Sequence, residues 1–164
     1  MKKAKPLFYA IEIIGIVFLV VCLLQRKNQL LLNIKEDPST LETAVNFQLT
    51  EEEDYFSTLK KGNNMLLFWG SACPHCEAVF ATLRMPKNSW IKERLFTISL
   101  DENIESIKES AKEYPIYLDF DLAVSNSYKV DSIPAVIIIS DEGKIVDRAK
   151  GEREVIKRIN VFSK

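Results

Sequence analysis

The sequence predicts an α/β fold, a central mixed β-sheet flanked by helices, preceded by an N-terminal transmembrane helix. Residues 7–24 are eighteen residues with a single charge, Glu12, which is typical of a membrane-spanning segment. Further along, short apolar runs that suit buried strands alternate with patterns that suit amphipathic helices. The chain then ends with a hairpin signal and a last helical pattern, which together favour a mixed rather than an all-parallel sheet.

The apolar run at 7–24 is the expected membrane anchor. As a helix it would be about 27 Å long, close to the hydrocarbon thickness of a bilayer. No small-residue cleavage site follows it, so we expect an uncleaved single-pass anchor over residues 1–25, in contact with membrane lipid, with lipidation of Cys22 as the alternative. More basic residues precede the run than follow it: Lys2, Lys3 and Lys5 against Arg26 and Lys27. This bias predicts a cytoplasmic N-terminus and an extracytoplasmic domain at the cell membrane.

Composition excludes some classes of function. The chain has 22 Lys and Arg against 23 Asp and Glu, a net charge of -1, and no basic block, so nucleic acid is not an expected partner. At 164 residues, of which 47% are hydrophobic, it can bury a core without disulfide staples. Its three cysteines are therefore available for chemistry.

The first part of the soluble region is expected to be a linker over residues 26–43, followed by a domain over 44–164. The alternation at 44–49 predicts a short strand. The sequence from Thr50 to Glu53 has the form of a capping box, which predicts a helix that ends at Gly62. The apolar run at 65–70 predicts a buried strand.

The remaining elements follow the same alternation. Pro74 favours the first position of a helix, and Pro86 is expected to bend or end it. Residues 94–100 predict a strand with Phe96 or Ile98 facing outward. The other predicted elements are a helix at 104–113, a short strand at 116–118, a short helix at 121–129, a buried strand at 135–140, a turn at 141–143, a partner strand at 144–148, and a last helix that buries Val155, Ile156, Ile159 and Phe162.

The segment GSACPHCEAV, residues 70–79, contains two of the cysteines and the only histidine. Cys73 lies at a predicted helix N-terminus, where the helix dipole and free N–H groups stabilise a thiolate. Cys76 is one turn further on, close enough to resolve a mixed disulfide. His75, when protonated, would stabilise the reduced form further. We therefore favour a redox couple, with Pro74 opening the helix.

Two other uses of the cysteine pair are less well supported. A structural zinc site needs four ligands, commonly from two separated pairs, and the chain has no second pair. A purely structural disulfide would gain little from closing so short a loop. We accordingly expect neither a metal nor another cofactor.

The segment FWGSACPHC resembles the active-site segment of the thioredoxin superfamily, and Ser132-Ile133-Pro134-Ala135 resembles its cis-proline loop. Residues 118–151 resemble membrane-anchored TlpA/ResA-like thiol-disulfide oxidoreductases. The resemblance covers about residues 44–162 and implies a thioredoxin-like fold. It also implies that Pro134 lies beside the cysteines and that the backbone of Ile133 pairs with the substrate peptide. Trp69 is a third candidate for substrate binding, with a place in the core as the alternative.

The sequence departs from that family at three places. Ala72 stands where a tryptophan is usual, and Leu67 stands where thioredoxin has a buried acid, for which Glu77 is a candidate substitute. The Pro-His dipeptide is the one found in DsbA, a strong oxidant with a nucleophile pKa of about 3.5. The scaffold thus favours reduction and the dipeptide favours oxidation.

The expected function is that of a membrane-tethered, extracytoplasmic protein thiol-disulfide oxidoreductase. It would act through Cys73 and Cys76 on cysteines of secreted or membrane proteins, with oxidation slightly favoured, and a membrane redox partner would recycle the pair. The first alternative is a TlpA/ResA-like reductase of extracytoplasmic disulfides, for example in cytochrome c maturation. A copper-binding chaperone is less favoured, because the chain has neither the wider cysteine spacing nor the distant histidine of that group.

Overall fold

The computed structural model describes residues 41–101 and 103–162. The predicted anchor over 1–25 and most of the predicted linker over 26–43 lie outside this part of the chain. Among the described residues no helix has the length and apolar character needed to cross a membrane. The residues from Leu41 onward belong to one compact unit.

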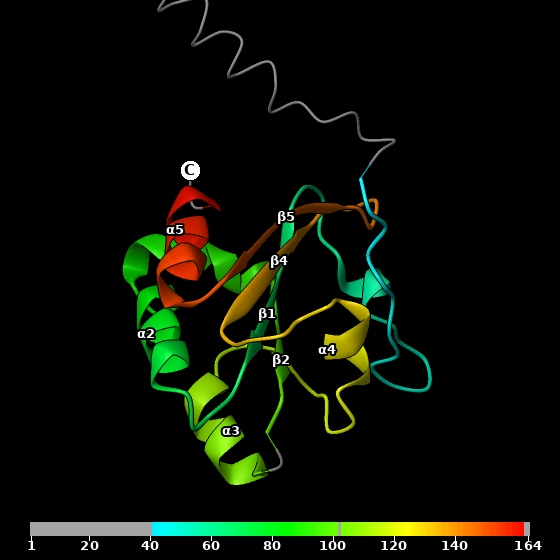
Figure 1. The fold of residues 1–164 in the computed structure, drawn as a ribbon. Helices are drawn as coiled ribbons and strands as arrows, with labels where there is room; N and C mark the ends of the chain where they lie inside the picture. Colours follow the sequence, from blue (N-terminus) through cyan, green and yellow to red (C-terminus); the bar gives the residue numbers. More distant parts are fainter. Residues whose placement is uncertain (1–40, 102, 163–164) are drawn as a thin grey trace, which may run out of the picture. The chain divides into compact units, whose positions relative to one another are not determined.

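The centre of this unit is a five-stranded mixed sheet with the strand order β3-β2-β1-β4-β5 (Figure 1). Its strands are β1 (Asn64–Trp69), β2 (Leu95–Ser99), β3 (Ile116–Leu118), β4 (Ala135–Ile139) and β5 (Ile145–Lys150). Strand β1 pairs in parallel with β2 and antiparallel with β4. Every residue of β1 is buried, as its continuous apolar sequence predicts. The predicted α/β class with a mixed sheet is confirmed.

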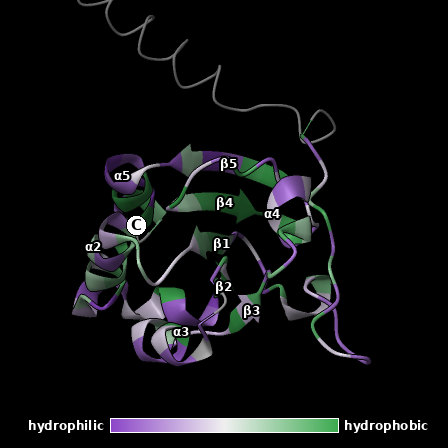
Figure 2. Cartoon of the chain, turned by 60° about the horizontal axis from the view of Figure 1, so that its bottom comes forward, coloured by the Kyte–Doolittle hydropathy of each residue, from purple (hydrophilic) through white to green (hydrophobic). Residues whose placement is uncertain are grey.

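Two layers of helices cover the sheet. Met65, Leu67 and Trp69 of β1 face a core shared with α2 (Pro74–Leu83), α3 (Ile104–Ala111) and α5 (Glu152–Phe162). Leu66 and Phe68 face the opposite core, which includes residues of α4 (Ala123–Ser127). The apolar strands lie between these layers in Figure 2. The period of two along β1 therefore divides the interior into two cores.

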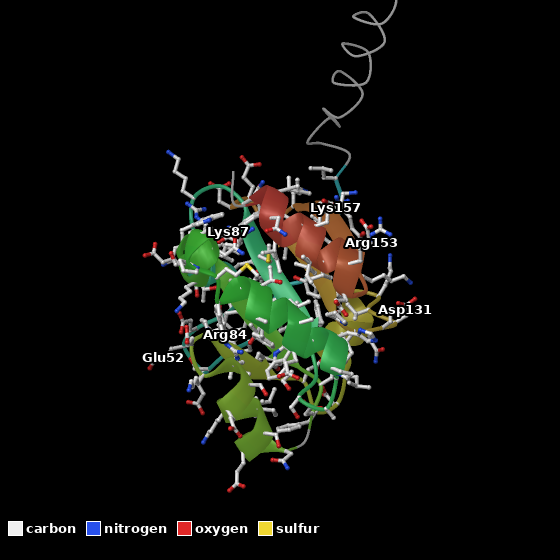
Figure 3. The ribbon with its side chains drawn as sticks, turned by 90° about the vertical axis from the view of Figure 1, so that its left-hand side faces the viewer. Glu52, Arg84, Lys87, Asp131, Arg153 and Lys157 are labelled. Atoms are coloured by element: carbon white, nitrogen blue, oxygen red, sulfur yellow. The ribbon has the colours of Figure 1, made fainter. Side chains whose placement is uncertain are left out.

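Helices α2 and α5 lie side by side on one face of the sheet, as Figure 3 shows. Val155 and Ile159 of α5 are completely buried, while Arg153 and Lys157 are exposed. This is the stripe that the sequence predicts for the last helix, although Ile156 and Phe162 are only half-buried. Burial of two large apolar side chains fixes the start of α5 relative to α2.

The region before β1 differs from the prediction. Residues 44–49 form no strand, and the helix expected after Thr50 is reduced to the 3₁₀ helix η2 (Phe56–Thr58). The hydroxyl of Thr50 does accept hydrogen bonds from the N–H groups of Glu52 and Glu53, but the segment makes a turn instead. Tyr55 stacks on Phe47 with ring centroids 4.9 Å apart, so aromatic packing takes the place of helical continuation.

Two further details were not predicted. The segment between α2 and β2 forms a second 3₁₀ helix, η3 (Pro86–Glu93). Ile98 of β2 is completely buried, because the second core covers the sheet face that we expected to be open.

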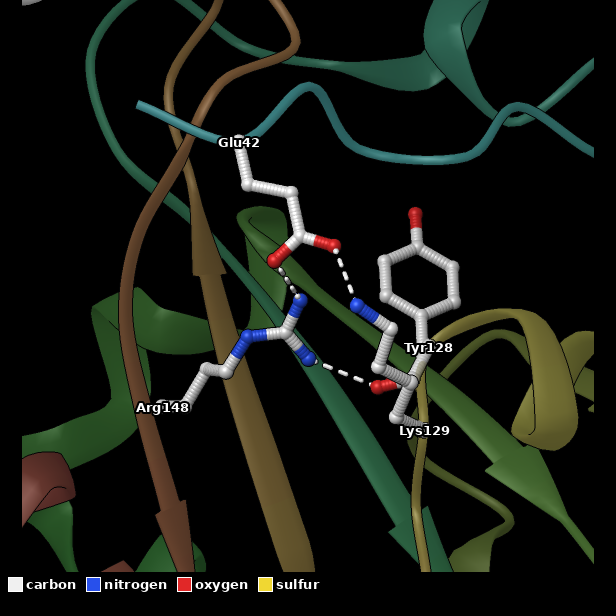
Figure 4. Close-up of polar contacts among 4 residues, drawn as sticks. All are labelled: Glu42, Tyr128, Lys129 and Arg148. Atoms are coloured by element: carbon white, nitrogen blue, oxygen red, sulfur yellow. Dashed lines mark hydrogen bonds and ion pairs between the residues drawn. The ribbon is translucent and has the colours of Figure 1, made fainter. Parts of the chain in front are cut away.

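The start of the described chain is held against β5 by a polar network (Figure 4). The carboxylate of Glu42 pairs with Arg148 at 2.8 Å and with Lys129 at 3.4 Å. Arg148 also donates to the carbonyl of Tyr128 at 2.6 Å. The guanidinium of Arg148 beside Glu42 lowers the pKa of that carboxyl.

Candidate active site

Cys73 lies at the junction of β1 and α2, at the carboxyl end of the central strand. It is the N-cap residue of α2, with Pro74 at the start of the helix. Its sulfur accepts a hydrogen bond from the N–H of Cys76 at 3.3 Å. Pro74 has no N–H, so the amide of Cys76 is among the first that this helix end can offer to a thiolate. The structure thus places Cys73 where the sequence predicts.

Cys76 is buried one turn further along α2, with 1% of its surface exposed, whereas Cys73 is half-buried. Both are free thiols in this structure. Burial raises the pKa of the Cys76 thiol to about 12, and the neighbouring Cys73 sulfur and the charge of Asp101 act in the same direction. The backbone N–H of Gly70 opposes them. Cys73 is therefore the more accessible of the two thiols and Cys76 the shielded one.

The loop before β4 contacts the active-site turn directly. The Ile133–Pro134 peptide bond is cis, and Pro134 is buried while Ile133 is half-buried. A Cβ on Gly70 would lie 3.0 Å from Cδ1 of Ile133. Because such a contact is too close for most side chains, the absence of a side chain at Gly70 lets Ile133 lie over the turn. The structure thus brings Ile133 and Pro134 to the same edge of the sheet as Cys73.

His75 is exposed, and its side chain contacts a carboxylate of another helix. Its Nδ1 lies 2.7 Å from Oε2 of Glu152, the first residue of α5, and the two side chains are 67% and 42% exposed. Sequence reasoning missed Glu152, because no local signal relates residues 77 positions apart. Within the described ranges no three His, Cys, Asp or Glu side chains gather into a group that could hold a metal ion.

Asp101 is a second charged residue that sequence reasoning missed. It follows β2, and its carboxylate accepts a hydrogen bond from the N–H of Ser71. Its Oδ1 would lie 3.2 Å from a Cβ on Gly70. Leu67 is buried in the core and Glu77 is exposed, so Asp101 is the acid whose charge acts on Cys76. A signal was present, since carboxyl ends of neighbouring parallel strands share one edge of a sheet.

Trp69 does not lie where a substrate-binding residue would. It is 1% exposed, and its ring packs edge-on against Phe80 with centroids 4.7 Å apart. Its position as the last residue of β1 turns it into the core beneath α2. The assignment of Trp69 to the substrate-binding surface was therefore wrong, and the alternative place in the core is the observed one.

Comparison with known proteins agrees with this geometry. Residues 51–155 match the family described as "Thioredoxin-like domain". The chain belongs to the thioredoxin-like family. The mixed sheet flanked by helices described above agrees with membership of that family.

Named relatives of this thioredoxin-like chain share one activity. It is 28% identical over 128 residues to a thiol-disulfide oxidoreductase ResA of Bacillus cereus, covering 73% of this chain and 74% of that one. It is 27% identical over 162 residues to ResA of Bacillus subtilis, covering 92% and 88%. The protein is a thiol-disulfide oxidoreductase.

Solved structures show the same fold. The crystal structure of StoA from Bacillus subtilis aligns with a TM-score of 0.52 at 21% identity, over 69% of this chain and 95% of StoA. A thiol:disulfide interchange protein from a Bacteroides species aligns with a TM-score of 0.57 at 20% identity, over 76% and 90%.

Proposed function

We propose that this protein is a membrane-tethered, extracytoplasmic thiol-disulfide oxidoreductase that reduces disulfides of secreted or membrane proteins. The observation that carries the proposal is the pairing of an accessible Cys73 at a helix N-terminus with a buried Cys76. The apolar run at 7–24 and its flanking basic residues support the membrane location.

In the reducing direction the thiolate of Cys73 attacks one sulfur of a substrate disulfide. A mixed disulfide forms, and the other substrate sulfur leaves as a thiolate. Cys76 then loses its proton, attacks the Cys73 sulfur and releases the second substrate thiolate. The substrate gains two electrons and the protein becomes the Cys73–Cys76 disulfide. A membrane redox partner that supplies two electrons and two protons would restore the dithiol.

The direction of electron transfer depends on how stable the reduced form of the cysteine pair is relative to its disulfide. A thiol pair is strongly oxidising only where the protein stabilises the thiolate of its reduced form, as in DsbA. Here burial raises the pKa of Cys76 to about 12, and the carboxylate of Asp101 adds to that shift. Cys76 therefore adds no stabilised thiolate to the reduced form, and the similarity to ResA proteins supports the reducing direction. The Pro-His dipeptide at positions 74 and 75 favours oxidation, which is the second candidate direction.

The surface beside Cys73 is suited to an extended peptide. Ile133 is half-buried against the active-site turn, and its loop is outside the strands of the sheet. A substrate segment that adds to this backbone would place its own cysteine beside Cys73, with the buried Pro134 behind it.

The proposed direction is tested by the reduction potential of the full chain in detergent micelles, measured in glutathione buffers. A value near or below about -270 mV is expected for a reductase, and a value near about -120 mV would instead indicate an oxidant. The location is tested with a membrane-impermeant maleimide on spheroplasts that express the full chain. Labelling of Cys73 without lysis is expected, and labelling only after lysis would contradict an extracytoplasmic domain.

A further inference from the structure

We propose that Asp101 is a positioning residue of the thiol-disulfide reaction, whose carboxylate fixes the turn that carries Cys73 and places a negative charge beside the buried Cys76. The inference rests on the Cys73–Cys76 couple of the proposed function. It gives a role in that couple to a residue that follows β2 and lies 30 positions from Ser71 of the active-site turn.

The turn that carries Cys73 begins where β1 ends. The N–H of Cys73 donates to the carbonyl of Gly70 at 3.2 Å, which closes a four-residue turn. The N–H of Ser71, the second residue of this turn, takes no part in that bond and donates instead to Oδ2 of Asp101. Asp101 thus holds, from outside the turn, the backbone that leads into Cys73.

Asp101 is itself fixed by the sheet. Strand β2 lies parallel to β1 with Ser99 in register with Trp69, and the N–H of Leu100 donates to the carbonyl of Trp69 at 3.0 Å. The hydroxyl of the buried Ser99 lies 3.5 Å from Oδ2 of Asp101 and accepts a hydrogen bond from the N–H of Asp101 at 3.4 Å. The carboxylate therefore extends from backbone that is held next to the end of β1.

Gly70 lies between Asp101 and the cis-proline loop. A Cβ on Gly70 would lie 3.2 Å from Oδ1 of Asp101 and 3.0 Å from Cδ1 of Ile133. The carboxylate and the Ile133 side chain therefore both pack at the place that a side chain of Gly70 would take. Without the carboxylate the turn is free to shift relative to Ile133, where the substrate is proposed to bind, and a misplacement of about 1 Å can cost about 100-fold in rate.

The charge of Asp101 is not neutralised by a neighbouring cation. Among the described residues no ion pair includes Asp101. Its carboxylate raises the pKa of the Cys76 thiol in the same direction as burial and the Cys73 sulfur, whereas the N–H of Gly70 lowers it. Asp101 therefore acts on the two cysteines by different means, on Cys73 through the turn and on Cys76 through its charge.

The test compares Asp101→Ala with Asp101→Asn in the full chain. The alanine removes both the acceptor of the Ser71 N–H and the charge, whereas the asparagine keeps an acceptor oxygen and removes only the charge. The first readout, in a Cys76→Ser background at pH 7, is the rate at which the Cys73 thiolate attacks oxidised glutathione, forms a mixed disulfide and releases one glutathione thiolate. The second is the pKa of Cys76, from ¹³C NMR of the reduced chain with both cysteines.

Asp121→Ala is the matched control. Asp121 follows β3 as Asp101 follows β2, and it is exposed. Its carboxylate accepts a hydrogen bond from the N–H of Ala123 at 3.1 Å rather than from the active-site turn.

We expect Asp101→Ala to slow mixed-disulfide formation about tenfold, because the turn loses its anchor, and Asp101→Asn to recover most of that rate. Both variants should lower the pKa of Cys76, because both remove the charge. Asp121→Ala should change neither the rate nor the pKa.

The inference is overturned by an unchanged rate in Asp101→Ala, by an equal loss of rate in Asp101→Asn or Asp121→Ala, or by an unchanged pKa of Cys76 in Asp101→Asn. If Asp101→Ala does not fold, the pKa of Cys76 in Asp101→Asn decides by itself. These results leave the proposed function standing. A Cys76→Ser chain that forms no mixed disulfide on Cys73 would overturn both.

Discussion

Burial gives the thiol of Cys76 an unusually high pKa. Burial raises it to about 12, whereas an ordinary cysteine has a pKa of about 8.5. At pH 9 an ordinary thiol is about three-quarters thiolate, while Cys76 should be thiolate in only about one molecule in a thousand. We therefore expect the thiol of Cys76 to remain protonated throughout a titration from pH 6 to pH 10.

The measurement is ¹³C NMR of the cysteine Cβ atoms in the reduced full chain, with each signal assigned by single substitution. Cys73→Ala provides an internal test, because it removes the hydrogen bond and charge of the Cys73 sulfur but leaves the burial. The pKa of Cys76 should then fall but stay above the ordinary value, since burial is the largest cause. A Cys76 signal that is half-titrated at or below pH 9 in the wild-type protein would refute this reasoning.

Three further perturbations follow from the fold. Gly70→Ala places a Cβ 3.0 Å from the Cδ1 of Ile133. We therefore expect the rate of disulfide exchange to fall about 10- to 100-fold, with the melting temperature little changed. An exchange rate equal to that of the wild-type protein would contradict this contact. Ile159→Ala should lower the free energy of unfolding, measured by chemical denaturation, by about 2 to 5 kcal/mol. Val161→Ala, at a position that is 61% exposed, should change it by no more than about 0.5 kcal/mol. Equal losses in the two variants would contradict the docking of α5. Glu42→Gln should lower the melting temperature slightly at pH 7. Because the folded pKa of Glu42 is lowered, its stabilisation is present above the ordinary value of about 4.3 and is lost as the pH falls below it, so a difference that persists at lower pH would contradict the ion pair.

Most of the fold could be predicted because its elements carry strong local signals. The continuous apolar run of β1, the Pro74 helix start and the stripe of Val155 and Ile159 each have one physical explanation, burial or helix geometry. The failures lie where long-range packing decides. Thr50 has the side chain for a helix cap, but the stacking of Tyr55 on Phe47 holds the following segment in a turn, and a local pattern contains no information about that contact.

The residues of the candidate site also fall into two groups, those that short motifs predict and those that only tertiary packing brings together. Cys73, Cys76 and Pro134 could be identified because the chemistry depends on short motifs with fixed spacing. Trp69 was misassigned because proximity to the motif in sequence does not determine which face of the strand a side chain takes. Glu152 could not be found at all, since its contact with His75 exists only once α5 docks beside α2. The charge balance of the site is therefore a tertiary property.

The central claim is that Cys73 attacks the substrate and Cys76 resolves the mixed disulfide. It is tested most directly by trapping, with Cys76→Ser and Cys73→Ser forms of the full chain expressed in bacteria and analysed by non-reducing electrophoresis after acid quenching. We expect Cys76→Ser to accumulate mixed disulfides with extracytoplasmic proteins that disappear on reduction, and Cys73→Ser to form none. Mixed disulfides of equal abundance in Cys73→Ser, or their absence in Cys76→Ser, would contradict the assignment of the two thiols.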